Sequence, residues 1–483
     1  MTRIKADIAI IGGGSGGLSV AAGAAQMGAR VVLFEGGRMG GDCLNSGCVP
    51  SKALLAAAKA AHQARGNAAM GIKNDAPEID FAAVKAYVAR VIDMIAPHDS
   101  AERFESLGVT VIPEMARFAS AHDLVSASHH VRAKFIIIAT GSTPLIPPIT
   151  GLSDVPFHTN ETIFADTEKP TRLLVIGGGP IGVEMAQAHL RLGCEVTLIE
   201  AARILPRDDP ALVHMLRKQL CDASLALYEG VAITSIAKID KRRRAKTGAS
   251  QDDIIEISLA DGQKLSGSHL LLAAGRTPHI DGLDLPAAGV YSTRNGILTD
   301  TRLRTNRAHI FAIGDVTGRP QFTHIAGYHA GIVLRNCLFR IPAKVNDDVV
   351  PWVTYCDPEL AHVGLDRQAA ERRYGAANIR CLSAPLNVND RAITEGRQDG
   401  MLCAVLHRNG RILGASILAP SAGEMILTWC LAISQKARIA SLARLVAPYP
   451  TYGEASKRLA GSFFTSRLFS PLTRWLVQFL LRF

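Results

Sequence analysis

The chain contains 483 residues and carries a formal net charge of +10, from 53 lysines and arginines and 43 aspartates and glutamates. Hydrophobic residues make up 48% of it and charged residues 20%, proportions that are typical of a folded α/β protein and exclude a disordered or fibrous chain. A chain of this length is too long for one hydrophobic core, so we expect roughly two to four domains.

The chain opens with a strand, a glycine-rich turn, a helix and a second strand. The apolar pattern predicts the first strand at Ala6–Ile11, the helix at Leu18–Met27 and the second strand at Arg30–Phe34. The N-terminus superficially resembles a signal peptide, but its apolar run, Ile8–Ile11, is too short and continues directly into glycines. No segment reaches the roughly 18 apolar residues that span a bilayer. We therefore predict a cytoplasmic protein.

The turn after the first strand matches the pattern G-x-G-x-x-G. Gly12 permits the tight turn, Gly14 lets a pyrophosphate approach the backbone, and Gly17 lets the helix pack closely on the strand. Glu35 follows Gly12 by 23 residues, where a carboxylate can accept both ribose hydroxyls. Strand, glycines, helix, strand and terminal acid together predict a dinucleotide site.

A short polar loop, GGDCLNSGCVPSK at residues 40–52, carries Cys43 and Cys48. The spacing allows half of a metal site, a structural staple or a redox-active disulfide. The other cysteines form no second close-spaced pair that would complete a zinc site. A disulfide across so short a loop would add little stability, because the entropic gain grows with loop length. We therefore predict a redox pair and no metal site.

The residues after the cysteines support this prediction. Pro50 suits the first turn of a helix, which places Cys48 at the helix N-terminus. The partial positive charge there lowers the pKa of a thiol and holds a thiolate. Cys43 lies farther out on the loop and is freer to meet a substrate. A chain with nine cysteines, an odd number, does not resemble a disulfide-stapled secreted domain.

The same dinucleotide pattern returns later in the chain. We predict strands at Arg172–Ile176 and Glu195–Ile199, with the second strand followed by Glu200, 23 residues after the first glycine. Two such units imply two dinucleotides, one held tightly as a flavin and one exchanged as a nicotinamide. The glycines of this second turn are Gly177, Gly179 and Gly182.

Glu200 also predicts which nicotinamide is used. A carboxylate at the ribose favours a free 2′-hydroxyl and repels a 2′-phosphate, so NADH is expected rather than NADPH. Arg203 lies close enough in sequence to weaken that discrimination.

Positive charge is concentrated in one run, KRRRAK at residues 241–246. The flanking segments Ile233–Ile239 and Ile254–Leu259 alternate like strands, so the run reads as a solvated hairpin tip. No aromatic residues interleave these charges, and we therefore expect no nucleic-acid partner.

The stretches GGGSGG, GGDCLNSGCVPSK, GGGPIGVE and FAIGD occur in that order along the chain. Together they resemble the flavoprotein disulfide reductases, which include dihydrolipoamide dehydrogenase, glutathione reductase and mercuric reductase. The resemblance implies FAD in the first site, a homodimer, and a path of electrons from NADH through the flavin to the cysteine pair. From there they pass to a thiol/disulfide substrate or a soft metal ion.

The resemblance also implies roles for individual residues. Cys48 would be the charge-transfer thiol against the flavin, and Cys43 would be the interchange thiol. Lys52 would pair with Glu184 beside the flavin's reactive nitrogen. The remaining expected site residues are Gly41, Thr140, Gly141, Gly314 and Asp315 for FAD, with Gly275 and Arg276 for the nicotinamide cofactor.

The chain departs from the family pattern near its C-terminus. The family's dimerisation domain supplies a His-Pro…Glu motif from the partner subunit, but here the stretch is APYPTYGE at residues 447–454. Tyr449 stands where the histidine would be, and Glu454 keeps the acid. A phenol with a pKa near 10 is a poor base, so efficient lipoamide chemistry is not expected. Tyr449 either takes part in the reaction or packs at the dimer interface.

The fold class we predict is α/β, with two Rossmann-type dinucleotide-binding domains and a C-terminal α+β dimerisation domain. Strands of the last domain are expected at Met401–Leu406 and Arg411–Leu418. The expected domains are 1–155 and 279–345 for the two parts of the FAD-binding domain, 156–278 for the NAD(P)-binding domain, and 346–483 for the dimerisation domain with its tail.

The tail, residues 462–483, has apolar residues at helical spacing and three arginines mostly elsewhere. Such a stripe packs on its own protein, here on the dimer, or lies on an anionic membrane surface. We expect packing, because Pro471 shortens the helix.

The sequence therefore predicts an FAD-dependent enzyme that passes electrons between NADH and a thiol/disulfide substrate. A second hypothesis is an NADH:quinone or diaphorase-type reductase held at the membrane by the tail. A third is a flavin redox sensor that does not turn over.

Overall fold

The computed structural model describes residues 1–239 and 254–483, which form two compact units. The first unit comprises Met1–Arg203 and Ala226–Val345, and the second comprises Ile204–Leu225 and Asn346–Phe483. The basic run at residues 241–246 lies outside the described residues.

A seven-stranded sheet forms the first part of the first unit, and both of its faces are buried. Its strand order is β5-β2-β1-β8-β7-β6, with β20 beside β8; the pairs among β1, β2, β5, β8 and β20 are parallel. The bounds are β1 Thr2–Ile11, β2 Val31–Phe34, β5 Val109–Ile112, β6 Arg117–Phe118, β7 Asp123–Val125, β8 His129–Ile138 and β20 Ile310–Ala312.

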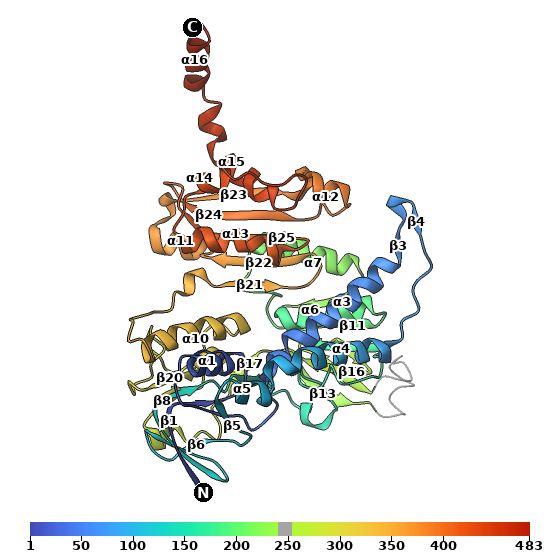
Figure 1. The fold of residues 1–483 in the computed structure, drawn as a ribbon. Coiled ribbons are helices and arrows are strands. Elements are labelled where there is room, and N and C mark those ends of the chain that lie inside the picture. Colours follow the sequence, from blue (N-terminus) through green and yellow to red (C-terminus); the bar gives the residue numbers. More distant parts are fainter. Residues whose placement is uncertain (240–253) are drawn as a thin grey trace. The chain divides into compact units, whose positions relative to one another are not determined.

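Alternate residues of β1 enter two different cores. Ile8 and Ile10 pack on the side of α1 (Ser15–Gln26) and α10 (Thr323–Cys337), which lie side by side in Figure 1. Ala9 joins the core on the opposite face. Because both faces are covered, the strand is a continuous apolar run instead of an alternating one.

A second parallel sheet, β12-β11-β10-β16, carries the second glycine turn. The turn leads from β10 into α6 (Pro180–Arg191), and a three-stranded antiparallel sheet, β13-β14-β15, follows in the same unit. The bounds are β10 Arg172–Ile176, β11 Glu195–Glu200, β12 Ala226–Glu229, β13 Ile233–Lys238, β14 Ile255–Leu259, β15 Lys264–Gly267 and β16 His269–Leu272. The predicted strands are present here, with ends shifted by at most one or two residues.

The second unit is built on a five-stranded antiparallel sheet, β21-β22-β25-β24-β23. Trp429 of α13 is fully buried in its core and donates its indole N–H to Ser456 Oγ at 3.1 Å. The bounds are β21 Pro351–Thr354, β22 Glu359–Gly364, β23 Ile379–Pro385, β24 Met401–His407, β25 Ile412–Ala419, α7 Pro210–Asp222, α11 Arg367–Tyr374, α12 Asp390–Thr394, α13 Ala422–Ser434, α14 Ile439–Ala443 and α15 Glu454–Leu468.

The C-terminal tail forms a separate helix, α16 (Pro471–Leu480), after α15 ends at Leu468. Ser470 caps it by accepting a hydrogen bond from the Thr473 N–H at 3.2 Å. None of its residues is buried, and in Figure 1 it projects from the sheet of its own unit. The expectation that the tail packs on its own protein, at the dimer, stays a prediction. No helix within the described ranges has the length and hydrophobicity to cross a bilayer.

Candidate active site

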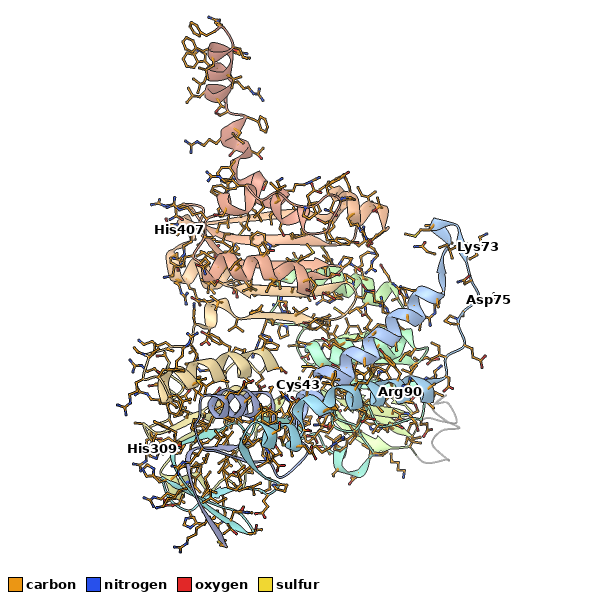
Figure 2. The ribbon with its side chains drawn as sticks, viewed as in Figure 1. Cys43, Lys73, Asp75, Arg90, His309 and His407 are labelled. Atoms are coloured by element: carbon orange, nitrogen blue, oxygen red, sulfur yellow. The ribbon has the colours of Figure 1, made fainter. Side chains whose placement is uncertain are left out.

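The two cysteines of the polar loop lie in two consecutive helices. Cys43 lies in the short helix α2 (Gly41–Asn45), and Cys48 is the first residue of α3 (Cys48–Ala64). Figure 2 shows Cys43 beside the N-terminal end of α3. Both are free thiols in the structure, and the helix begins at Cys48 as the proline spacing predicts.

The surroundings of the two sulfurs shift their thiol pKa values in opposite directions. The Cys43 thiol, by hydrogen bonding to Cys48, lowers the pKa of Cys48 to about 6, with smaller contributions from Thr323 and the charge of Lys52. The same bond and burial raise the pKa of Cys43. Cys48 Sγ lies 3.3 Å from Thr323 Oγ1, at the start of α10. In the dithiol state, Cys48 therefore carries the thiolate near neutral pH.

Lys52 extends from the first turns of α3 toward α6. Its Nζ lies 2.8 Å from Glu184 Oε2, so the structure forms the ion pair that the family resemblance implies. The Glu184 side chain is 5% exposed and that of Lys52 is 37% exposed. A carboxylate this deeply buried needs a paired cation, so the bond fixes the ammonium in place one helical turn from Cys48.

The cysteine loop is braced through Asp42. Its carboxylate accepts hydrogen bonds from Asn160 Nδ2 at 2.8 Å and Ser46 Oγ at 2.9 Å, and lies 3.3 Å from an Arg276 nitrogen. Asn160 also donates to the carbonyl oxygen of Ser46 at 3.1 Å. These contacts join the cysteine loop to the segments that carry Asn160 and Arg276, both distant from it in sequence.

Arg276, which is predicted for the nicotinamide site, lies among residues that are predicted to bind FAD. It belongs to β17 (Arg276–Pro278), which pairs with β9 (Ser142–Pro144), and donates to Ser142 Oγ at 2.8 Å. Ser142 in turn donates to Asp315 Oδ2 at 2.6 Å. Burial raises the pKa of Asp315, and Ser142 and Arg276 oppose that rise.

The neighbouring turns predicted for FAD are also joined by hydrogen bonds. Thr140 Oγ1 donates to the carbonyl oxygen of His279 at 2.6 Å, and the His279 N–H donates to Gly141 O at 2.9 Å. Gly314 donates its N–H to Nδ1 of the buried His329 at 3.1 Å. Gly275 has a φ of +127°, a conformation that favours glycine.

The first glycine turn leaves no room for side chains at two of its positions. A Cβ added to Gly12 would lie 2.4 Å from Ala139 O, and one added to Gly17 would lie 1.9 Å from Gly12 O. At the end of β2, Glu35 accepts hydrogen bonds from the N–H groups of Gly13 at 2.6 Å and Gly37 at 2.7 Å. The carboxylate is thereby held beside the turn, where a ribose would be recognised.

The second turn repeats this geometry. A Cβ added to Gly177 would lie 2.3 Å from Ala273 O, and one added to Gly182 would lie 1.8 Å from Gly177 O. Glu200 accepts from the N–H groups of Gly178 at 2.7 Å and Ala202 at 2.9 Å.

Both turns fit the pyrophosphate of a dinucleotide. Gly14 and Gly179 are the N-caps of α1 and α6, and a Cβ at Gly179 would meet no atom within 4 Å. At Gly14 the nearest atom would be Gly41 Cα, at 3.8 Å. Each glycine thus leaves open the space at a helix N-terminus where backbone N–H groups and the helix dipole attract phosphate.

Tyr449 and Glu454 lie in the second unit and are not hydrogen-bonded to each other. Tyr449 is 69% exposed and donates its hydroxyl to Asp390 Oδ2 at 2.7 Å, an interaction that raises the pKa of the phenol. Glu454 begins α15, and its Oε1 lies 3.7 Å from an Arg458 nitrogen. Its Oε2 is buried with no hydrogen-bond partner among the described residues.

Several residues of the site escape sequence reasoning. Thr323 meets Cys48 across 275 residues of chain, and Asn160 meets Asp42 across 118. Each is an ordinary polar residue in an unremarkable segment, so only the folded chain reveals its position. Ser142 differs, because it directly follows the predicted Thr140-Gly141 turn.

The fold and this pair of thiols define the class of protein. Residues 6–330 match the pyridine nucleotide-disulphide oxidoreductase family, and residues 350–460 match the dimerisation domain of that family. The chain belongs to this family, which confirms the predicted family and α/β fold class. It is an FAD-dependent pyridine nucleotide-disulfide oxidoreductase with a redox-active disulfide.

Individual members of the family resemble this chain over nearly its whole length. The mercuric reductase of Streptomyces lividans is 34% identical over 469 residues, covering 95% of this chain and 96% of that protein. The dihydrolipoyl dehydrogenase of Thermus scotoductus is 33% identical over 458 residues, covering 93% and 95%. The Cu(II) complex of the HOCl-induced flavoprotein disulfide reductase RclA from Escherichia coli superposes with a TM-score of 0.82 at 27% identity, covering 94% of this chain and 99% of that one.

Proposed function

We propose that this enzyme uses NADH to reduce a thiophilic acceptor, with a thiol-binding metal ion favoured over lipoamide. The observation that carries the proposal is the hydrogen bond from Tyr449 to Asp390, which raises the pKa of the phenol. At neutral pH such a group can donate a proton but cannot remove one from a thiol.

The acceptor follows from the protonation of the cysteines. Cys48 holds the thiolate, whereas the raised pKa of Cys43 keeps its proton on sulfur. A disulfide substrate would require Cys43 to lose that proton to a base before it attacks. A thiophilic cation requires no base, because a metal–sulfur bond replaces the sulfur–hydrogen bond and the proton leaves to solvent. Relatives named mercuric reductase, and a neighbour solved as a Cu(II) complex, agree with such an acceptor.

The remaining residues stabilise the Cys48 thiolate and position the cysteine loop. Bound FAD would supply the acceptance of hydride from the nicotinamide and the delivery of an electron pair to the sulfur pair. Lys52, fixed by Glu184, holds positive charge beside Cys48 and stabilises its thiolate. Asn160 and Arg276 position the loop through Asp42.

NADH is the proposed donor because of Glu200. Its two carboxylate oxygens are bound to the N–H groups of Gly178 and Ala202, which holds negative charge beside the second turn. That charge suits the hydroxyls of an unphosphorylated ribose and opposes a 2′-phosphate.

We further propose a homodimer in which Tyr449 and Glu454 complete the partner's site. The match of residues 350–460 to a dimerisation domain supports a pair of subunits. The buried Glu454 Oε2, which has no hydrogen-bond partner among the described residues, agrees with a ligand supplied by the other subunit.

An acceptor panel tests this function. The purified flavoprotein is assayed with NADH and mercuric ion, cupric ion, glutathione disulfide or lipoamide, alongside the variants Tyr449→His and Tyr449→Phe. We expect metal-ion reduction in the wild type and in Tyr449→Phe, and a gain in lipoamide reduction of about tenfold or more only in Tyr449→His, within the range that a general base contributes. Efficient lipoamide reduction by the wild type would contradict the proposal.

A second candidate function is NADH:quinone reduction at a membrane surface, and the exposed helix α16 favours it. Residues 455–483 contain five basic residues and no acidic ones. An apolar face with flanking arginines suits an anionic bilayer. The large exposed apolar residues of α16 and the chain end are Leu472, Trp475, Leu476, Val477, Phe479, Leu480, Leu481 and Phe483.

Vesicles test that candidate directly. Phe479→Glu places a charge on the apolar face, and Gln478→Glu adds the same charge at the neighbouring polar position. If α16 binds lipid, sedimentation with phosphatidylglycerol vesicles falls much further in Phe479→Glu. Quinone reduction that survives Cys43→Ser would favour the quinone function over the thiol route.

A further inference from the structure

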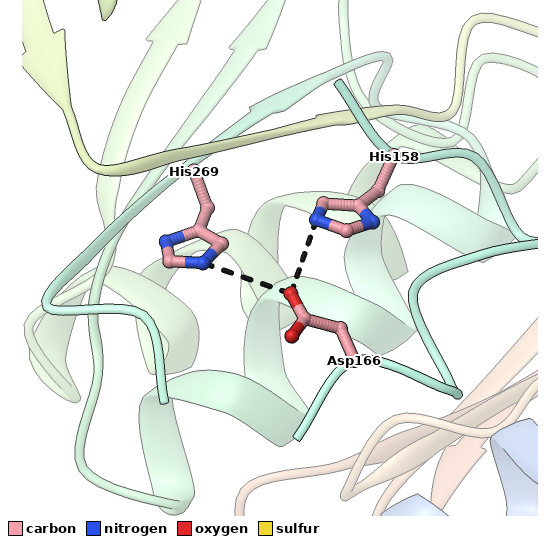
Figure 3. Close-up of side chains that lie close together, drawn as sticks. All are labelled: His158, Asp166 and His269. Atoms are coloured by element: carbon pink, nitrogen blue, oxygen red, sulfur yellow. Dashed lines mark ion pairs between the residues drawn. The ribbon is translucent and has the colours of Figure 1, made fainter. Parts of the chain in front are cut away.

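Two histidines and an aspartate that have no role assigned above converge at the edge strand β16 of the first unit. His158 Nε2 lies 3.1 Å from Asp166 Oδ2, and His269 Nε2 lies 3.6 Å from the same oxygen. The three ligand atoms all lie within 4.8 Å of one another. Figure 3 shows the two rings on either side of the carboxylate.

The backbone places these side chains on one face of the sheet edge. His158 bridges to Leu271 in parallel, with its N–H donating to Leu270 O at 2.7 Å and its carbonyl oxygen accepting from Leu272 at 2.8 Å. His269 precedes Leu271 by two residues, so it points to the same side of the sheet as His158. The two rings are stacked, with centroids 6.0 Å apart.

A second layer of hydrogen bonds orients each ligand. His158 Nδ1 lies 3.2 Å from Thr162 Oγ1, and His269 Nδ1 lies 2.9 Å from Ser268 Oγ. The other oxygen of Asp166 accepts the Glu168 N–H at 3.0 Å. Such outer partners fix the ring orientation and tautomer of metal-binding histidines.

The two Nε2 atoms and Asp166 Oδ2 form an arrangement that favours a cation between them. When each Nδ1–H donates to its hydroxyl neighbour, both Nε2 lone pairs face Asp166 Oδ2. A single proton on one histidine can form a hydrogen bond in only one of the two histidine–aspartate contacts. One divalent cation can bind all three ligand atoms, the two Nε2 atoms and Asp166 Oδ2. Tetrahedral zinc bonds of about 2.0–2.1 Å place neighbouring nitrogen and oxygen ligands about 3.3 Å apart, between the two observed distances.

We propose that His158, Asp166 and His269 bind one divalent transition-metal ion of the zinc type, with solvent completing its coordination. The ion would fasten residues 158–166 to the edge strand β16. The same segment carries Asn160, which holds Asp42 and Ser46 of the cysteine loop. The metal would therefore act as a structural clamp on the segment that positions the redox loop, and the proposal does not depend on the identity of the electron acceptor. It replaces the expectation of no metal site, which considered cysteine ligands only.

Zinc titration of the flavin-loaded, chelator-treated enzyme tests the site. The Cys43–Cys48 pair is kept oxidised so that its thiols cannot bind the metal. We expect one zinc ion per chain by calorimetry, affinity lower by about 100-fold or more in His158→Gln and His269→Gln, and lower by about tenfold in Thr162→Val. A matched control is His309→Gln, because His309 stacks on His122 at 3.9 Å outside this cluster; its zinc affinity should be unchanged.

X-ray absorption at the zinc edge of the wild type gives a result that requires no variant. Two imidazole nitrogens with oxygen and no sulfur would support the site. The proposal is overturned if the wild type binds no zinc in the micromolar range, if the spectrum contains sulfur ligands, or if folded His158→Gln binds zinc as tightly as the wild type.

Discussion

Gly14 and Gly179 occupy equivalent positions in the two glycine turns, but different parts of the chain surround them. Gly14 forms a parallel bridge with Gly40, whose N–H donates to Gly13 O at 2.9 Å, and a Cβ added at Gly41 would lie 2.7 Å from Gly14 Cα. A Cβ added at Gly179 would meet no atom within 4 Å. Residues 40–41 therefore lie against one side of the first turn, whereas none of the described residues approaches the second turn at Gly179 in this way.

We expect this difference to separate the roles of the two glycine turns, one holding a cofactor tightly and the other exchanging it. We expect a dinucleotide at the first turn to lie against this segment, which would have to move in a separate step before the ligand leaves and would slow its dissociation. The open second turn imposes no such step. The covering segment, residues 40–42, overlaps the start of α2, the helix that carries Cys43. We therefore expect the segment that covers the first cofactor also to position the thiols beside it.

Alanine at the two equivalent glycines should have the largest and most contrasting effects. Gly14→Ala places a methyl group where we expect the first pyrophosphate to bind. Losing one or two hydrogen bonds to charged phosphate, at about 1.5–3 kcal/mol each, should weaken flavin binding about tenfold or more. Gly179→Ala should keep the flavin and raise the KM for NADH. Flavin absorbance after gel filtration measures flavin retention, and steady-state kinetics measure the KM for NADH. Equal loss of flavin in both variants would contradict the assignment of the flavin to the first turn and of NADH to the second.

A substitution in the covering segment, residues 40–42, should have the next largest effect, on the rate of flavin dissociation. Gly41 has a φ of +58°, so alanine there adds backbone strain of about 1–2 kcal/mol as well as the contact with Gly14. We expect flavin to dissociate about tenfold faster from Gly41→Ala. Gly28→Ala is the control, because Gly28 has a φ of +84° and no atom within 4 Å of an added Cβ. If both variants lose flavin equally, the strain and not the covering contact is responsible.

Glu200 should control the choice of nicotinamide. Glu200→Gln removes one charge-assisted hydrogen-bond acceptor at the ribose, worth about 1.5 kcal/mol or more, so kcat/KM for NADH should fall about tenfold. The value for NADPH should hold or rise, because the repelling charge is gone. An unchanged ratio of the two kcat/KM values would remove the basis for NADH as the donor.

The smallest effect concerns the thiolate. The charge of Lys52 helps to hold the pKa of Cys48 at about 6, so alkylation of Cys48 in the dithiol enzyme should accelerate as pH rises through that value. In Lys52→Met the midpoint should move upward, because the thiolate loses a nearby cation. Lys59→Met, on the exposed side of the same helix, should leave the midpoint in place. A midpoint unchanged in Lys52→Met would show that hydrogen bonds alone stabilise the thiolate.

The sequence predicts the parts of the molecule whose signals are local. Strand β10 falls at its predicted residues, and Glu35 and Glu200 lie beside their turns, because strand periodicity and glycine spacing act over about 25 residues. Thr323 beside Cys48 and the cluster of His158, Asp166 and His269 depend on contacts across long stretches of chain. No local pattern encodes them.

The C-terminal region shows a different limit. The sequence identifies Tyr449 as an unusual residue, but not its hydrogen bond to Asp390, which lies 59 residues earlier. It also identifies the amphipathic tail without indicating its partner, because hydrophobic spacing reports which face is apolar and not which surface covers it.

Anaerobic titration with NADH tests most directly that electrons leave a bound flavin through the neighbouring sulfur pair. With the first equivalent of NADH, the wild type should develop a long-wavelength absorption band from the Cys48 thiolate against the oxidised flavin. The band should weaken as pH falls through about 6 and be absent from Cys48→Ser. A purified protein without a yellow cofactor, or one whose flavin is bleached by NADH with no such band, would contradict the account.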